Sequence, residues 1–191
     1  MRLRAPRITP LSDNDMSDEQ KEVLAHHYKR GRVLNIFRTL VRSPKGYKRF
    51  SLWGGYILGP NSDLDPRERE ILILRAGFNC KSGYEWAQHK AIGLDSGLTE
   101  VEIEAIKVGA EDPSWKKSDA LLITAADELT EDKFISNDTW AALQEFFTQK
   151  QMMDAVMTVG QYTQVSMMLN SFGIQLEEGQ ELDEDLVKWA Q

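Results

Sequence analysis

Apolar residues recur at helical spacing along nearly the whole chain. One example is the i, i+3, i+4, i+7, i+8 series formed by Val33, Ile36, Phe37, Leu40 and Val41. The run Ile71–Leu74 is apolar on every side, so its helix belongs in the core. No alternating apolar and polar run bounded by turn residues competes with this pattern. The sequence therefore predicts an all-α fold in a single domain.

Capping residues set the expected helix boundaries. Ser17 and Gln20 form a capping box, and proline occupies the first helical turn after Ser43, Asp65 and Asp112. Glycine or a polar break ends several of the helices. The expected helices cover residues 17–30, 43–57, 65–79, 83–95 and 99–109, one opening at 112–113 that carries Leu121, Leu122 and Ala125, one starting at Ser136 or Asn137, and one over 151–172.

Three parts are expected along the chain. Residues 1–16 form an irregular N-terminal arm, and residues 17–176 form the helical domain. Residues 177–191 make an acidic C-terminal tail with six acids and one base. That tail is either solvated or docked through Leu182, Leu186 and Trp189.

The composition is that of an ordinary globular protein, but the acidic and basic residues are concentrated in different segments of the chain. The chain has 191 residues, 41% of them hydrophobic, and a formal net charge of −7. No apolar run reaches the roughly 20 residues that a membrane span requires. An h-region typical of a signal peptide does not follow the basic N-terminus. We expect a soluble cytoplasmic protein with no membrane partner.

Residues 23–62 carry eight bases and no acid, interleaved with aromatic side chains. One interpretation is a nucleic-acid groove, since such grooves combine cations with stacking aromatics. However, Phe37 belongs to the apolar helical series, so the aromatics are explained more simply as core and the bases as its solvated face. The acidic total also argues against a nucleic-acid partner.

The candidate chemistry centres on His89. Glu85 lies four residues before it on the same helical face, within reach of a carboxylate–imidazole hydrogen bond, and Glu70 precedes the apolar run. A buried carboxylate needs a partner, and a paired imidazole suits proton transfer near neutral pH. His26 and His27, near a helix end, are expected on the surface. Metal ligation by the three site residues is an alternative, although the spacing differs from the di-iron Glu-x-x-His motif.

The single cysteine, Cys80, limits the redox chemistry available. One cysteine can form neither an internal disulfide nor a dithiol centre. A peroxidase using Cys80 with an external thiol remains an alternative, beside the commoner role of a cysteine as a small core residue.

Three segments resemble the carboxymuconolactone decarboxylase family, the superfamily that includes the AhpD alkylhydroperoxidases. They are residues 64–75, 84–89 and 97–103, with weaker likeness around 35–44 and 162–172. The resemblance implies an all-α fold and homo-oligomers, commonly trimers or hexamers with a dimer possible, whose sites lie near subunit contacts.

The AhpD motif is a glutamate followed by Cys-x-x-Cys-x-x-x-His. Glu70 and His89 match its glutamate and histidine, which serve as a proton relay in that branch. The two cysteine positions hold Ser82 and Glu85, and Cys80 falls two residues before the first. Dithiol peroxide reduction is therefore not expected, because neither serine nor glutamate can replace a thiol in it.

The leading hypothesis is a decarboxylase-like lyase or isomerase that acts by acid–base proton transfer on a small carboxylate or lactone. His89, Glu85 and Glu70 are the expected catalytic residues, and Ser82, Tyr84 and Trp86 the expected substrate-binding residues. The expected reaction needs no cofactor and no metal. Arg38, Arg42 or Arg75 could bind an anionic substrate, and Tyr84 or Tyr162 could donate to its carbonyl. A non-catalytic family member is the remaining alternative.

Overall fold

The computed structural model describes residues 2–189, which form an all-α fold. No strand occurs within these residues, so the predicted fold class is confirmed. None of the helices in this range is long and apolar enough to cross a lipid bilayer. The helices are α1 (Asp18–Lys29), α2 (Asn35–Leu40), α3 (Pro44–Ile57), α4 (Pro66–Asn79), α5 (Gly83–Asp95), α6 (Glu100–Val108), α7 (Lys117–Glu131), α8 (Asn137–Leu143), α9 (Gln149–Phe172) and α10 (Glu184–Val187).

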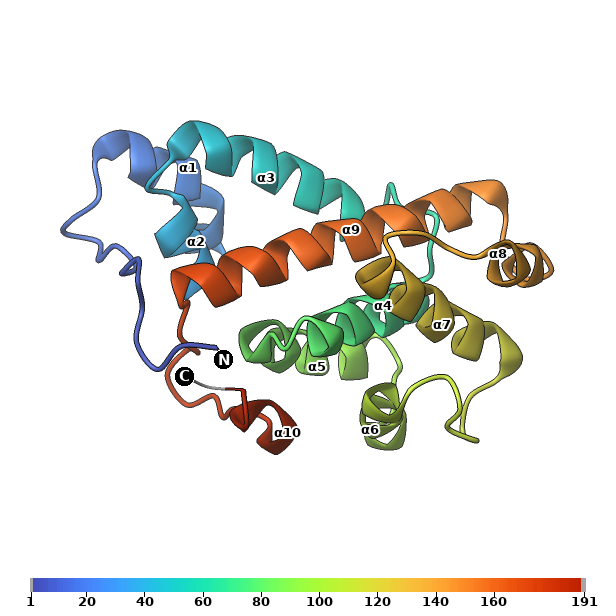
Figure 1. The fold of residues 1–191 in the computed structure, drawn as a ribbon. Helices are drawn as coiled ribbons and strands as arrows, with labels where there is room; N and C mark the ends of the chain where they lie inside the picture. The colour runs from blue at the N-terminus through green and yellow to red at the C-terminus, as the bar shows by residue number, and fades with distance from the viewer. Residues whose placement is uncertain (1, 190–191) are drawn as a thin grey trace.

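Helix α4 is the centre of the main core. The side chains of Ile71–Leu74 are fully buried, as the all-round apolar run predicts. Helices α5, α7 and α9 pack against α4 from different sides, because no face of this run can remain in water. The long helix α9 crosses the molecule between α3 and the α4–α5 pair (Figure 1).

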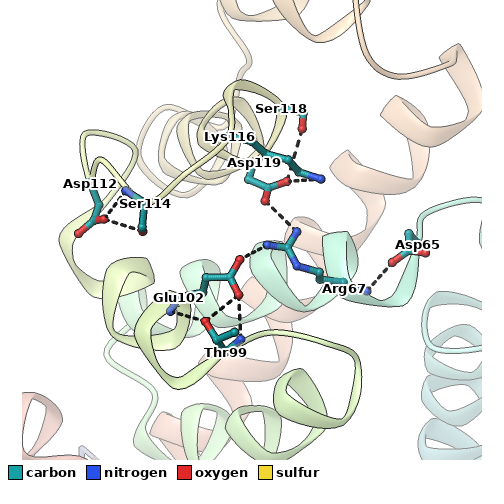
Figure 2. Close-up of polar contacts among 9 residues, drawn as sticks. All are labelled: Asp65, Arg67, Thr99, Glu102, Asp112, Ser114, Lys116, Ser118 and Asp119. Atoms are coloured by element: carbon teal, nitrogen blue, oxygen red, sulfur yellow. Dashed lines mark hydrogen bonds and ion pairs between the residues drawn. The ribbon is translucent and has the colours of Figure 1, made fainter.

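An ion-pair cluster fixes the start of α4 to its neighbours. The guanidinium of Arg67 donates to Glu102 at the start of α6 and to Asp119 of α7, the latter at 2.7 Å (Figure 2). Asp119 is only 1% exposed. A carboxylate this deeply buried is stable only with a charged or hydrogen-bonding partner, and Arg67 forms the shortest of its contacts, with Lys116 and Ser118 farther away at 3.5 Å.

The N-terminal third forms a second apolar cluster around Leu24, Val41 and Tyr47. The prediction that both histidines of α1 lie on the surface is correct for His26 but wrong for His27. The His27 ring stacks on Phe37 at a centroid distance of 4.0 Å, and its Nε2 lies 2.6 Å from the Tyr47 hydroxyl. Burial, helped by the nearby positive charges, lowers the pKa of His27 to about 4. It is therefore a neutral packing residue.

The predicted start of α7 at residues 112–113 is also wrong, because the helix begins at Lys117. The backbone N–H and the hydroxyl of Ser114 both donate to the Asp112 carboxylate, at 2.9 and 2.6 Å. The indole of Trp115 donates to the Gly109 carbonyl. These local bonds hold a turn where the sequence pattern indicates a helix start.

The acidic tail docks on the domain. Leu186 of α10 is 1% exposed within the main core. Lys107 of α6 pairs with Asp183 at 2.8 Å. Glu177 accepts hydrogen bonds from the Tyr84 hydroxyl and the Asn35 backbone, both at 2.7 Å. Of the two alternatives for this segment, docking is the one that the structure shows.

Candidate functional site

The site is built on the α4–α5 hairpin. Lys81 adopts a left-handed conformation with φ of 56°, and the Ser82 N–H then donates to the Gly77 carbonyl at 2.9 Å, which turns the chain back. A side chain at Gly77 would place its Cβ 3.2 Å from the Cγ of Glu85. Glycine therefore allows α5 to approach α4 closely where the two helices carry their carboxylates.

His89 bridges two carboxylates at the helix interface. Its Nδ1 lies 2.6 Å from Oε2 of Glu70, and its Nε2 lies 3.0 Å from Oε1 of Glu85. A hydrogen bond at 2.6 Å needs one proton between the two atoms, and we assign that proton to Nδ1 of His89. Glu70, Glu85 and His89 therefore converge on one site, and the shorter, better-formed contact comes from Glu70.

Glu70, Glu85 and His89 are buried to different degrees. Glu70 has no exposed side-chain surface, whereas Glu85 and His89 keep 5% and 8%. Any approach to the three residues therefore reaches Glu85 or His89 before Glu70.

Burial and mutual charge shift the acid–base properties of the site. Burial raises the pKa of Glu85 to about 7, with repulsion from Glu70 adding to it and His89 opposing it. For His89, burial acts to lower the pKa, but the charges of Glu70 and Glu85 outweigh it and raise the pKa above its usual value. Both groups can therefore hold a proton near neutral pH.

Helix α9 closes the site. The Tyr162 ring meets the His89 ring edge-on, with centroids 4.8 Å apart. Burial, followed by the charges of Glu85 and Glu70, raises the pKa of Tyr162 well above its usual value, so the phenol stays protonated. Sequence reasoning named Tyr162 only as a possible carbonyl donor, since its position next to His89 depends on how α9 packs.

Seven buried side-chain polar atoms in residues 2–189 lack a hydrogen-bond partner, and all belong to α4, α5, α9 or the cap of α5. They come from Arg69, Glu70, Ser82, Glu85, Trp86, Thr158 and Ser166. Folded proteins satisfy nearly all buried polar groups, so a concentration of unsatisfied ones needs a functional explanation. Arg69, Thr158 and Ser166 were not among the predicted site residues.

Arg69 is the buried cation next to this group. Its Nε lies 3.9 Å from Oε1 of Glu70, beyond hydrogen-bond distance, and its side chain is 9% exposed. The residue directly precedes Glu70 in a chain segment that the sequence assigns to the core. A basic residue before a buried apolar run is the only sequence signal that could have identified it.

The three predicted substrate-binding residues lie in different surroundings. Ser82 is fully buried at the start of α5, and its hydroxyl has no partner. The Tyr84 hydroxyl donates to Glu177 of the tail, within a separate apolar cluster. Trp86 packs on Phe78 and lines a cavity of about 450 Å³ beside the tail. Ser82 and Trp86 each carry a buried polar atom without a partner, whereas the Tyr84 hydroxyl is bonded.

The three arginines considered as anion ligands also lie in different parts of the structure. Arg75 donates to Asp127 and to two backbone carbonyls, and Arg38 donates to Asp13 and two carbonyls. Both are therefore occupied in structural contacts. Arg42 lines a different cavity, between α3 and α9.

Cys80 ends α4 as a half-buried thiol. Burial raises its pKa, although the nearby hydroxyls of Thr163 and Ser166 oppose the shift. A raised pKa reduces the thiolate fraction, and the thiolate is the nucleophilic form. These surroundings favour the structural role of Cys80 over the peroxidase alternative.

Among the described side chains, no group of three or more His, Cys, Asp or Glu residues is arranged to hold a metal ion. The reason at this site is geometric. The two ring nitrogens of His89 face separate carboxylates on opposite sides of the ring, so their donor atoms do not share a common point.

Comparison with known families identifies the central segment. Residues 44–128, from α3 to α7, match the carboxymuconolactone decarboxylase family. The matched segment covers less than half of the chain. Within it, Ser82 and Glu85 occupy the two positions that align with the cysteines of the AhpD motif. No curated protein matches the chain.

Solved structures of AhpD-like proteins and of a debrominase share the fold of this chain. An AhpD-core, peroxidase-related protein from Ralstonia eutropha JMP134 is 18% identical, with a TM-score of 0.79 over 91% of this chain and 93% of its own. A peroxidase-related protein from Silicibacter sp. TM1040 is 15% identical, with a TM-score of 0.77 over 92% and 95%. A variant of the debrominase Bmp8 in complex with 2,3,4-tribromopyrrole is 10% identical, with a TM-score of 0.75 over 92% and 94%. At these identities the likeness concerns the fold.

Proposed function

We propose that this protein is an enzyme that moves a proton on a small carboxylate or lactone, in decarboxylase, lyase or isomerase chemistry. The observation that carries the proposal is the buried position of His89 between Glu70 and Glu85, each of which also carries a buried carboxylate oxygen without a hydrogen-bond partner. Such a group is costly for folding, and the match of residues 44–128 to the carboxymuconolactone decarboxylase family supports a catalytic use for it.

The geometry suggests distinct roles for the two glutamates. Glu70 is the deepest group and fixes the tautomer and orientation of His89 through Nδ1. Glu85 is nearer the surface, and its Oε1 lies 3.0 Å from Nε2 of His89 without a formed hydrogen bond, close enough for a proton to pass between the two groups once they align. In this arrangement Glu85 and His89 exchange the proton with the substrate, while Glu70 is a positioning residue.

A decarboxylation can be written with these groups. The bond between the substrate carbon and its carboxylate breaks, carbon dioxide leaves, and the electron pair remains on the substrate as an enolate. The proton shared by Glu85 and His89 is then transferred to that carbon, and water restores it to the site. Arg69 is the cation nearest to the relay, and its charge favours the anionic intermediate.

The test is turnover of a carboxymuconolactone-type substrate in deuterium oxide, followed by NMR. We expect product with deuterium at the carbon that lost the carboxylate. His89→Gln should lower the rate by about 10²–10⁴-fold, the usual contribution of a general acid–base group. Glu70→Gln should also lower the rate and move the pH profile, because it changes the pKa of His89.

His26→Gln is the matched control, since His26 is an exposed histidine of the same chain. It should leave the rate unchanged. Equal rates for wild type, His89→Gln and His26→Gln would remove His89 from the reaction and refute the proposed mechanism. Circular dichroism of each variant separates a lost relay from a lost fold.

A further inference from the structure

A cavity of about 600 Å³ lies between α9 and the α2–α3 segment, away from Glu70, Glu85 and His89. Its walls are mainly apolar and aromatic, and Phe50, Trp53, Met168 and Phe172 contribute to them. The volume falls in the usual range for small-molecule sites, which also combine apolar walls with a few polar groups. In Figure 1 this region lies between α9 and the α3 helix that runs beside it.

An amide side chain lines this cavity. Gln161 of α9 is 5% exposed as a whole residue, and its amide is not among the buried polar atoms that lack a partner. An amide carries both a donor and an acceptor. Gln161 can therefore form hydrogen bonds with a ligand that has a polar group at this position.

Two cations stand at the same cavity. Arg49 of α3 lines it and forms no ion pair within the described part of the chain. Arg42 also lines it, and its Nε and Nη2 donate to the Thr9 carbonyl at 3.0 and 2.9 Å, which holds the guanidinium in place. No acidic side chain among the described residues lines the cavity. Its charge is complementary to an anion.

We propose that this cavity binds an organic anion with an apolar body, such as an aliphatic or aromatic monocarboxylate. The apolar part lies against the aromatic walls, and the carboxylate pairs with Arg49 and Arg42, with the Gln161 amide as a further hydrogen-bond partner. The site is independent of the proposed proton-transfer function, because none of its lining residues belongs to the relay.

The test uses octanoate as the anionic probe and octanol as its neutral counterpart. The full-length protein carries carbon-13-labelled methionine methyl groups for NMR, and Met168→Leu assigns the cavity signal. Octanoate should shift the Met168 signal and displace the fluorescent anion anilinonaphthalene sulfonate. It should leave the signal of Met153, an exposed residue of α9 outside the cavity, in place. Octanol should bind more weakly.

The charge requirement is tested by Arg49→Gln against Lys48→Gln. Both residues are exposed on α3 and both changes remove one positive charge, but only Arg49 lines the cavity. We expect octanoate binding about three- to tenfold weaker for Arg49→Gln, the effect of losing one partly exposed charged contact. Binding to Lys48→Gln should stay within about twofold of wild type.

Three outcomes would overturn the proposal. They are equal binding of octanoate and octanol, an equal effect of the two charge variants, and a probe response at Met153 without one at Met168. Rising salt gives a second measurement that needs no variant. It should weaken the binding of octanoate and leave that of octanol unchanged.

Discussion

Glu85→Gln should stabilise the protein, by an amount that depends on pH. Glu85 is buried beside Glu70, and its pKa rises from 4.5 to about 7 on folding. Between these two values the folded protein binds more protons than the unfolded chain, so stability falls as pH rises. Glutamine has the shape of the protonated glutamic acid but cannot ionise, so the variant avoids this loss.

The size of the stabilisation follows from the difference between the pKa values of Glu85 in the unfolded and folded protein. A difference of about 2.5 pKa units corresponds to about 3 kcal/mol, at about 1.4 kcal/mol per unit. Below pH 4.5 wild type and Glu85→Gln should have similar free energies of unfolding. The advantage of the variant should grow between pH 4.5 and about 7 and stay constant above that range.

Urea unfolding followed by circular dichroism at several pH values from about 4 to about 8 measures this difference. Glu22→Gln serves as the control, since Glu22 is exposed on α1 and should show no such trend. A difference in the free energy of unfolding between Glu85→Gln and wild type that does not change with pH would refute the reasoning. So would a variant less stable than wild type at the alkaline end of the series.

Three further results are expected. Arg67→Met leaves the buried Asp119 carboxylate without its main partner, and should lower the free energy of unfolding by about 2–3 kcal/mol in urea titrations. Gly173 has φ of 70°, and a Cβ there would lie 2.8 Å from a backbone oxygen, so Gly173→Ala should lower the melting temperature. Gly160→Ala, in open space within α9, should raise or preserve it. Cys80 should react with iodoacetamide more slowly than a free cysteine at the same mildly alkaline pH, as a mass-spectrometric time course would show, because burial raises its pKa.

Local sequence signals account for most of the fold. The capping boxes at Ser17 and Thr99 start α1 and α6 where the pattern predicts them, and the Asp65 side chain caps α4. The apolar run Ile71–Leu74 is the centre of the core. These features act within a few residues, so the sequence contains all that is needed to predict them.

The predictions from sequence are wrong where a contact with residues distant in the chain, or a competing local hydrogen bond, determines the structure. His27 lies at a helix end that favours an exposed cation, but Phe37 and Tyr47 pack against its ring. Asp112 has the sequence of a helix start, but Ser114 occupies its carboxylate. In each case tertiary packing or a local side-chain bond outweighs a weak helical preference.

The sequence by itself determined the helical fold and the family resemblance of its central segment, and it singled out Glu70, Glu85 and His89 as candidates, because periodicity, caps and motif spacing are local properties. Only the tertiary structure decided how those residues meet. The i, i+4 spacing places Glu85 near His89, but the contact of Glu70 with Nδ1 joins residues 19 positions apart and depends on the close α4–α5 approach at Gly77. The different burial of Glu70, Glu85 and His89 is likewise a property of the packed protein.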